Sequence, residues 1–116
     1  MKGKYSITHP QATWDMINIL ATYLGDLRGL TITDATGGIG GDTISFARRF
    51  RQVHTFEINP EHGDVIRHNL GVYTAAQPSA FPAKVTMHVG DKNGDYTSHY
   101  KKITQDVVFM DPPWGG

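Results

Sequence analysis

Apolar and polar positions follow two periods along this chain, one typical of helices and one typical of strands. After Thr8, which resembles a helix N-cap, apolar side chains recur every three or four positions until the turn that Gly25 begins. This pattern predicts a well-buried helix. Its predicted apolar positions are Ala12, Met16, Ile19 and Tyr23, widened by Trp14, Ile17, Leu20 and Leu24.

Four short segments have the composition of strands: residues 30–34, 52–58, 84–91 and 105–110. A helix with Thr43, Phe46, Ala47 and Phe50 on one face follows the first, and Pro60 opens a helix over residues 61–70 after the second. The composition of residues 71–83 predicts a loop. The composition of residues 92–103 predicts a polar connection with a turn at Asn93-Gly94. Strands separated by helices favour an α/β fold with a mostly parallel sheet. The last strand is apolar enough to be central.

Composition narrows the class of protein without naming it. The chain has 116 residues, which suits a single domain, and no cysteine, which excludes disulfides and thiolate chemistry. Its formal net charge is +0, so charge alone does not indicate a nucleic-acid binder, and we interpret the arginines near residue 50 as a solvated helix face. No apolar run reaches the roughly 18 residues that span a bilayer. We expect a soluble, intracellular protein.

The glycine-rich stretch that begins at Asp34 and ends at Ala47 organises the candidate chemistry. It joins a strand to a helix, and such a turn lets a ligand approach the backbone closely. The dinucleotide fingerprint needs a third glycine at position 43, where this chain has Thr43. Asp34 would repel a pyrophosphate and attract an ammonium or a sulfonium. These residues favour S-adenosylmethionine over a nicotinamide dinucleotide.

Two more acidic residues lie near the carboxyl ends of predicted strands. Glu57 is placed to accept hydrogen bonds from both hydroxyls of a ribose, and Asp91 is placed to accept one from the amino group of an adenine. Because ligands of open α/β sheets bind outside the carboxyl ends of the strands, Asp34, Glu57 and Asp91 should face one crevice. The six histidines show no metal-binding spacing, and we predict no metal site.

The segment from Asp111 to Trp114, Asp-Pro-Pro-Trp, follows the last predicted strand directly. Its prolines fix the backbone, so that the carboxylate of Asp111 and the carbonyl of Pro112 can accept the hydrogens of an exocyclic amine. Trp114 offers a flat face on which a base can stack. The pattern predicts transfer of a methyl group to the amine of a nucleobase.

Together these segments resemble the RNA cap guanine-N2 methyltransferase family, the trimethylguanosine synthases. The resemblance rests on the stretch from Asp34 to Ala47, on Phe56-Glu-Ile-Asn-Pro60, on Asn69 with Val72-Tyr73, and on Pro112-Pro-Trp-Gly-Gly116. It implies a Rossmann-like class I methyltransferase fold, S-adenosylmethionine as cofactor, and guanine N2 of a 7-methylguanosine RNA cap as acceptor. Capped RNA would be the partner, in the cytoplasm or the nucleus, and no membrane would be involved.

The resemblance also implies roles for individual residues. Trp114 would stack on the methylguanine as a cation–π contact, and Asp111, Pro112 and Trp114 would form the catalytic set. The implied cofactor-binding residues are Thr8, Asp34, Thr36, Gly37, Gly38, Gly40, Glu57, Ile58, Asp91 and Asp111. Residues 1–29 would form an N-terminal helical segment over the cofactor site, and residues 30–116 a partial methyltransferase domain that stops after the fourth strand.

Two departures from the family pattern keep alternatives open. The family usually has serine where this chain has Asp111, and Asp-Pro-Pro-Trp is also the pattern of adenine-N6 methyltransferases. The chain also stops at Gly116, where a class I methyltransferase normally continues with further strands, so the fourth strand would form an unpaired apolar edge. Either the chain is a fragment, or a second copy or a partner chain covers that edge. A non-catalytic module that pairs through this edge is therefore the second hypothesis. A glutamine-modifying methyltransferase and a nicotinamide-dependent oxidoreductase are weaker alternatives.

Overall fold

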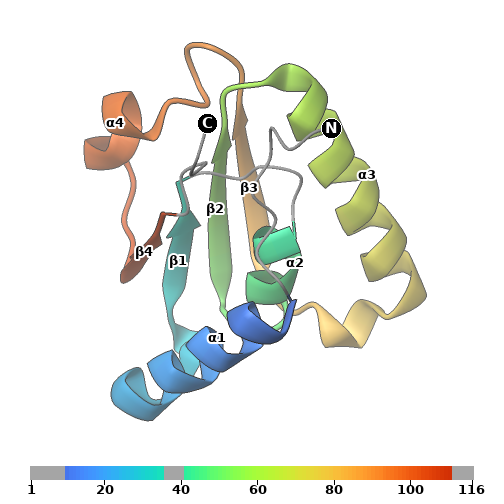
Figure 1. The fold of residues 1–116 in the computed structure, drawn as a ribbon, viewed down its shortest axis with the longest axis vertical. Helices are drawn as coiled ribbons and strands as arrows, with labels where there is room; N and C mark the ends of the chain where they lie inside the picture. Colours follow the sequence, from blue (N-terminus) through green and yellow to red (C-terminus); the bar gives the residue numbers. More distant parts are fainter. Residues whose placement is uncertain (1–9, 36–40, 111–116) are drawn as a thin grey trace.

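The computed structural model describes residues 10–35 and 41–110, which form a parallel four-stranded sheet with helices on both faces. The strands are β1 (Thr31–Asp34), β2 (Gln52–Glu57), β3 (Lys84–Val89) and β4 (Val107–Phe109), in the spatial order β3-β2-β1-β4. The helices are α1 (Pro10–Leu24), α2 (Gly41–Ala47), α3 (Pro60–Ala76) and α4 (Tyr96–His99). The predicted α/β class with a parallel sheet is confirmed (Figure 1).

The order of the strands reverses between β1 and β4. The chain moves outward from β1 through α2 and β2 to α3 and β3, and then returns through α4 to place β4 on the other side of β1. In open α/β sheets such a reversal marks the place where ligands bind. The carboxyl end of β1 is therefore the first place to look for a site.

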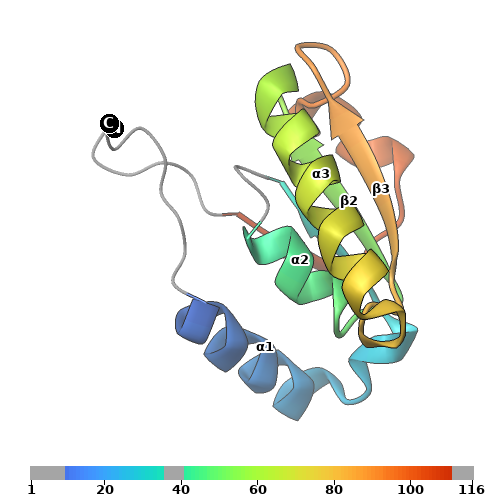
Figure 2. The ribbon, with the colours of Figure 1, turned by 90° about the vertical axis from the view of Figure 1, so that its right-hand side faces the viewer.

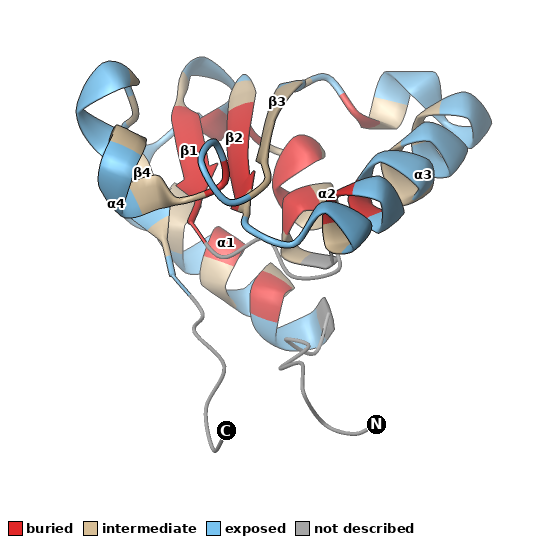
Figure 3. Cartoon of the chain, turned by 90° about the horizontal axis from the view of Figure 1, so that it is seen from above, coloured by how far each residue is buried: buried red, intermediate tan, exposed pale blue. Residues whose placement is uncertain are grey.

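One face of the sheet forms the apolar core together with α1, α2 and α3 (Figure 2). Side chains of a strand point alternately to its two faces. Ile32 of β1 and Val53 of β2 both point to the face that carries the core. They pack with Phe46 and Phe50, which meet edge to face, and with Ile17 of α1. The buried residues concentrate in β1, β2 and α2 (Figure 3). The core is thus built mainly around β1, β2 and α2.

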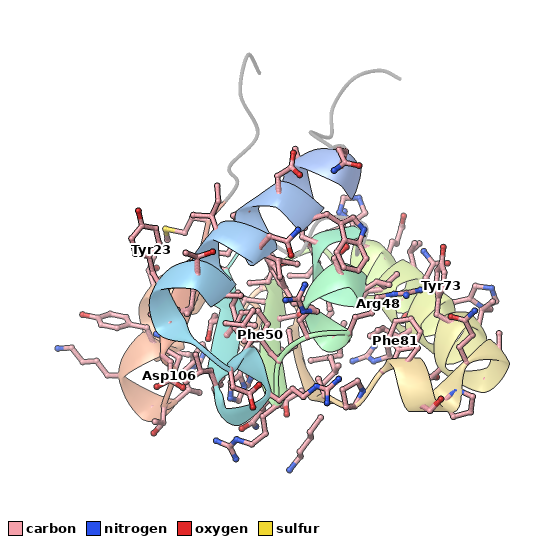
Figure 4. The ribbon with its side chains drawn as sticks, turned by 90° about the horizontal axis from the view of Figure 1, so that it is seen from below. Tyr23, Arg48, Phe50, Tyr73, Phe81 and Asp106 are labelled. Atoms are coloured by element: carbon pink, nitrogen blue, oxygen red, sulfur yellow. The ribbon has the colours of Figure 1, made fainter. Side chains whose placement is uncertain are left out.

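The prediction that the first helix is well buried is wrong. Ile19 is 58% exposed. Tyr23 is 82% exposed and lies at the outer surface of α1 (Figure 4). The buried positions are Thr13 and Ile17, one turn apart. Because α1 packs mainly on α2 and reaches the core of the sheet through Ile17, only a narrow stripe of the helix is covered.

The predicted loop over residues 71–83 is also wrong in its first half, because α3 continues to Ala76. Tyr73 in its last turns lies against Phe81, and the guanidinium of Arg48 stands 4.8 Å from the centre of the Phe81 ring (Figure 4). These contacts fix the end of α3 to α2. The polar connection after β3 likewise contains a structure that the sequence did not predict, the short helix α4.

The last strand is not central in the described sheet. β4 pairs with β1 on one side, and among the described residues nothing pairs with its other side. Val108 is 42% exposed on this edge strand. The expectation of an apolar strand at an open edge is therefore confirmed for the part of the chain that the structure describes. In that part, no helix combines the length and apolar composition that crossing a membrane requires.

The second face of the sheet carries a pair of histidines. His54 of β2 and His88 of β3 share a hydrogen bond of 3.0 Å between Nδ1 and Nε2, and His88 stacks on Phe56. Burial, and then the charge of Lys84, lower the pKa of His54. Burial, and then His54 and His99, lower the pKa of His88. Only one of the two facing nitrogens can carry a proton, so the pair is stable while at least one ring is neutral.

We predict that the free energy of unfolding falls as the pH is lowered through the ordinary histidine pKa of 6.5. Below that value the unfolded chain binds more protons than the folded chain, because folding lowers the pKa of both histidines. The loss should level off below the folded pKa values. Urea unfolding between about pH 5 and 8 measures it. His54→Gln should flatten the profile and His68→Gln, at an exposed position of α3, should not; a profile unchanged by His54→Gln contradicts this account.

Two glycines of α3 should respond oppositely to alanine. A Cβ on Gly63 would lie 2.5 Å from Cγ1 of Val89, whereas a Cβ on Gly71 would meet nothing within 4 Å. Gly63→Ala should destabilise the fold by about 1–3 kcal/mol through overpacking. Gly71→Ala should stabilise it by up to about 1 kcal/mol through helix propensity. Thermal unfolding compares the two, and no gain for Gly71→Ala would contradict a helix at that position.

Candidate functional site

Acidic residues gather at the carboxyl edge of the sheet, beside the point where the strand order reverses. Asp34 is the last residue of β1 and Glu57 the last residue of β2. Asp91 follows β3 by two residues. Because β1, β2 and β3 are adjacent and parallel, the three residues lie at the same edge of the sheet, at the upper ends of the strands in Figure 1. This is the edge at which ligands of such sheets bind.

The carboxylate of Asp34 is fully buried. Its Oδ2 accepts a hydrogen bond of 3.0 Å from the hydroxyl of Thr43, and that hydroxyl lies 2.8 Å from the hydroxyl of Thr55. Both threonines are also fully buried. A buried carboxylate needs such partners because desolvation is costly. Three polar side chains from β1, α2 and β2 therefore hold one another at the carboxyl edge of the sheet.

Glu57 is held by the loop that follows it. Its Oε2 accepts a hydrogen bond of 2.8 Å from the backbone N–H of Asn59 and lies 3.6 Å from Nδ1 of His62. Asn59 in turn caps α3 by accepting from the N–H of Glu61 at 2.8 Å. The side chain of Glu57 is only 11% exposed. Among the described residues Oε1 receives no hydrogen bond, so one oxygen fixes the side chain and the other can serve a ligand.

The turn after β3 is tied to the end of β2. Gly90 has a φ of +103°, which favours glycine, and its N–H donates to the carbonyl of Glu57 at 3.0 Å. The N–H of Gly94 donates to the carbonyl of Gly90 at 2.8 Å. Asp91 lies in this turn and is exposed. The strand that was predicted to reach Asp91 thus ends at Val89, and Asp91 stands outside it, where solvent and ligands can reach it.

An apolar side chain lies beside the acids. Ile58 follows Glu57 directly and is 53% exposed. A half-exposed isoleucine at the ligand-binding edge of a sheet gives a surface on which a flat ring can pack. Ile58 and Glu57 therefore offer an apolar and a hydrogen-bonding surface next to each other, as a nucleoside requires.

Several contacts of the site were not anticipated from the sequence. Thr13 of α1 donates a hydrogen bond of 2.7 Å to Oδ1 of Asp42, in the first turn of α2. This bond and the one between Thr43 and Asp34 fix the start of α2 from two sides. The sequence pattern weakly indicated a role for Asp42 at a helix start, since acidic residues favour the first turn of a helix. Thr13 and Thr55 had no such signal, because their partners are distant in sequence.

The remaining predicted site residues lie outside the described part of the chain. They are Thr8, Thr36, Gly37, Gly38, Gly40, Asp111, Pro112 and Trp114. Of the predicted set, the structure therefore places Asp34, Glu57, Ile58 and Asp91. These four lie at the ends of three neighbouring strands.

Both the sequence and the fold of this chain have counterparts among known proteins. The family model for RNA cap guanine-N2 methyltransferases matches residues 30–116. Trimethylguanosine synthase of Schizosaccharomyces pombe is 40% identical over 86 residues, which cover 73% of this chain and 34% of that protein. An uncharacterized protein of Acanthamoeba polyphaga mimivirus is 29% identical over 90 residues, which cover 78% of this chain and 32% of that protein. The chain thus spans about a third of the length of these curated relatives.

The fold has a counterpart among solved structures. A crystal structure from Porphyromonas gingivalis, of a protein assigned as a methyltransferase, superposes with a TM-score of 0.64. The match covers 92% of this chain and 24% of the other, at 20% sequence identity, and so concerns the fold. The fold of this solved structure agrees with the family indicated by the sequence, and the match to the family model spans most of the chain. The chain belongs to the RNA cap guanine-N2 methyltransferase family.

Proposed function

We propose that this chain binds S-adenosylmethionine and forms part of an enzyme that methylates guanine N2 of a 7-methylguanosine RNA cap. The observation that carries the proposal is the group of acids at the ends of β1, β2 and β3, in a chain of this family. The family match favours guanine over adenine as the acceptor base and favours an enzyme over a non-catalytic module. Because the chain spans about a third of its curated relatives, the remaining parts of the enzyme lie outside it.

The described residues fit this cofactor by their chemistry. Glu57 has one oxygen fixed by Asn59 and the other available for ribose hydroxyls. Ile58 offers an apolar surface for the adenine ring, and Asp91 is exposed nearby to accept from the adenine amino group. Asp34 supplies negative charge where the methionine ammonium would bind. The ribose, the adenine and the methionine ammonium of the cofactor therefore each have a residue of suitable type at the carboxyl edge of the sheet.

The other roles in the proposal fall on residues of the flanking segments. Thr36, Gly37, Gly38 and Gly40 would hold the methionine part with Asp34, and Thr8 would contribute from the segment before α1, with residues 1–29 over the cofactor site. When bound, the cofactor supplies an electrophilic methyl group on its sulfonium. Asp111 and the Pro112 carbonyl would accept the hydrogens of the guanine 2-amino group and orient its lone pair. Trp114 would stack on the cationic base.

The proposed substrate and fold also suggest a location and a partner. An enzyme acting on capped RNA would work in the nucleus or the cytoplasm. The open edge of β4, with the exposed Val108, favours a second copy of the chain as a partner through strand pairing. This pairing would cover the unpaired backbone groups of the edge.

The 116-residue chain should bind S-adenosylhomocysteine, the demethylated product, in isothermal titration calorimetry. Glu57→Gln should weaken binding about tenfold or more, because a neutral amide accepts from ribose hydroxyls less strongly than a carboxylate. Glu61→Gln is the matched control, since Glu61 is exposed in the first turn of α3. Absence of binding at ligand concentrations on the order of millimolar would contradict the proposal.

The acceptor is tested in the same preparation by transfer of a radiolabelled methyl group. The proposal expects label in a 7-methylguanosine cap analogue and none in an uncapped, adenine-containing RNA. Label in the adenine RNA alone would replace guanine N2 by adenine N6 as the target. Binding without transfer to either RNA would limit the function of this chain to holding the cofactor.

Self-association through β4 should appear as a concentration-dependent mass in sedimentation equilibrium. Val108→Lys should shift the equilibrium to the monomer, because a charged residue on an edge strand opposes pairing. Val72→Lys, on an exposed face of α3, is the control for added charge. A strict monomer at all concentrations would rule out the second copy.

A further inference from the structure

Thr43 occupies the position where the dinucleotide fingerprint has its third glycine. There the glycine lets the helix approach the strand closely, whereas here a threonine side chain fills the gap. Thr43 is fully buried, and its hydroxyl contacts both the Oδ2 of Asp34 and the hydroxyl of Thr55. The residue therefore spaces the start of α2 from the sheet and also bonds it to two strands.

The direction of these hydrogen bonds follows from the number of protons. A threonine hydroxyl has one proton to donate, and the hydroxyl of Thr43 donates it to the carboxylate of Asp34. The hydroxyl of Thr55 must then donate to Thr43. The three side chains form a directed chain from Thr55 through Thr43 to Asp34, in which each bond polarises the next.

The chain of bonds spans both ends of the glycine-rich turn. Asp34 is the last residue of β1 before the turn, and Thr43 lies in the first turn of α2 after it. Thr55 pairs with Asp34 in the register of β1 and β2. Oδ2 of Asp34 is thus fixed by these buried hydrogen bonds, and the orientation of the whole carboxyl group is fixed with it.

We propose that Thr43 is a positioning residue that sets the orientation of the Asp34 carboxyl group toward the amino-acid part of the cofactor. The proposal rests on the proposed function, because it assumes that S-adenosylmethionine binds at this edge. Thr43 acts through Asp34 and does not touch the ligand. Thr55 supports Thr43 by donating a hydrogen bond to its hydroxyl, while the proton of that hydroxyl is donated to Asp34.

The test uses two ligands that differ in the amino-acid part. S-adenosylhomocysteine carries the ammonium and carboxylate of that part, and 5′-methylthioadenosine lacks them. In calorimetry with the 116-residue chain, Thr43→Val should weaken S-adenosylhomocysteine about tenfold, the effect that orienting partners commonly have on the groups they hold. It should leave the affinity for 5′-methylthioadenosine unchanged. Thr43→Ser, which keeps the hydroxyl, should restore the affinity for S-adenosylhomocysteine.

Two further variants separate positioning from loss of folding. Thr33→Val is the matched control: Thr33 is fully buried in β1, and among the described residues its hydroxyl has no partner. It should change neither affinity. Thr55→Val keeps the bond between Thr43 and Asp34, so it should weaken S-adenosylhomocysteine less than Thr43→Val does and should also leave 5′-methylthioadenosine unchanged. If Thr43→Val does not fold, Thr55→Val tests the proposal in its place.

The outcomes are distinct. Equal weakening of both ligands by Thr43→Val and Thr55→Val, or no weakening of either, overturns the positioning role and leaves the proposed function standing. If the unmodified chain binds neither ligand, the proposed function fails and the positioning role fails with it. Selective weakening of S-adenosylhomocysteine, restored by Thr43→Ser, supports both.

Discussion

The structure depends on the burial of one carboxylate at the end of β1. Asp34 is withdrawn from solvent, and a carboxylate in that position is stable only with hydrogen-bond donors around it. Thr43 is such a donor, and its position in the first turn of α2 fixes that helix against β1 and β2. Phe46 of α2 and Phe50, which follows the helix, then fill the core, and Asp42 beside Thr43 holds α1 through Thr13. The polar floor at the carboxyl edge of the sheet and part of the apolar core are therefore built by the same helix.

The sheet topology places the other candidate ligand-binding groups relative to that floor. Parallel pairing of β1 with β2 and of β2 with β3 brings the ends of all three strands to one edge, and the strand order reverses beside β1. Glu57 is fixed there by the cap of α3, and the turn containing Asp91 is fixed by the carbonyl of Glu57. The acids occupy this edge because the backbone holds each strand end.

The sequence predicted local features well and tertiary contacts poorly. The strands and the acids at or near their ends follow from short-range patterns, so the edge that carries Asp34, Glu57 and Asp91 could be predicted. The length of α3 could not, because the contacts of Tyr73 and Arg48 with Phe81 favour structure where the prolines nearby suggested a loop. The exposure of Tyr23 was missed because an apolar period shows that a helix has a buried side, and the partner, here mainly α2, decides how much of it is covered. The link between Thr13 and Asp42 joins residues 29 positions apart and has no local signal.

The central claim is that the strand ends around Asp34, Glu57 and Asp91 form the cofactor site. Titration of the isotopically labelled chain with S-adenosylhomocysteine, followed by the chemical shifts of backbone amides, tests this claim most directly because it locates the ligand. The largest changes should occur at residues 34–35, 57–59 and 90–91, and residues 79–81, which follow the C-terminal end of α3, should not change. Changes that concentrate around His54, His88 and α4, or the absence of any change, would contradict the account.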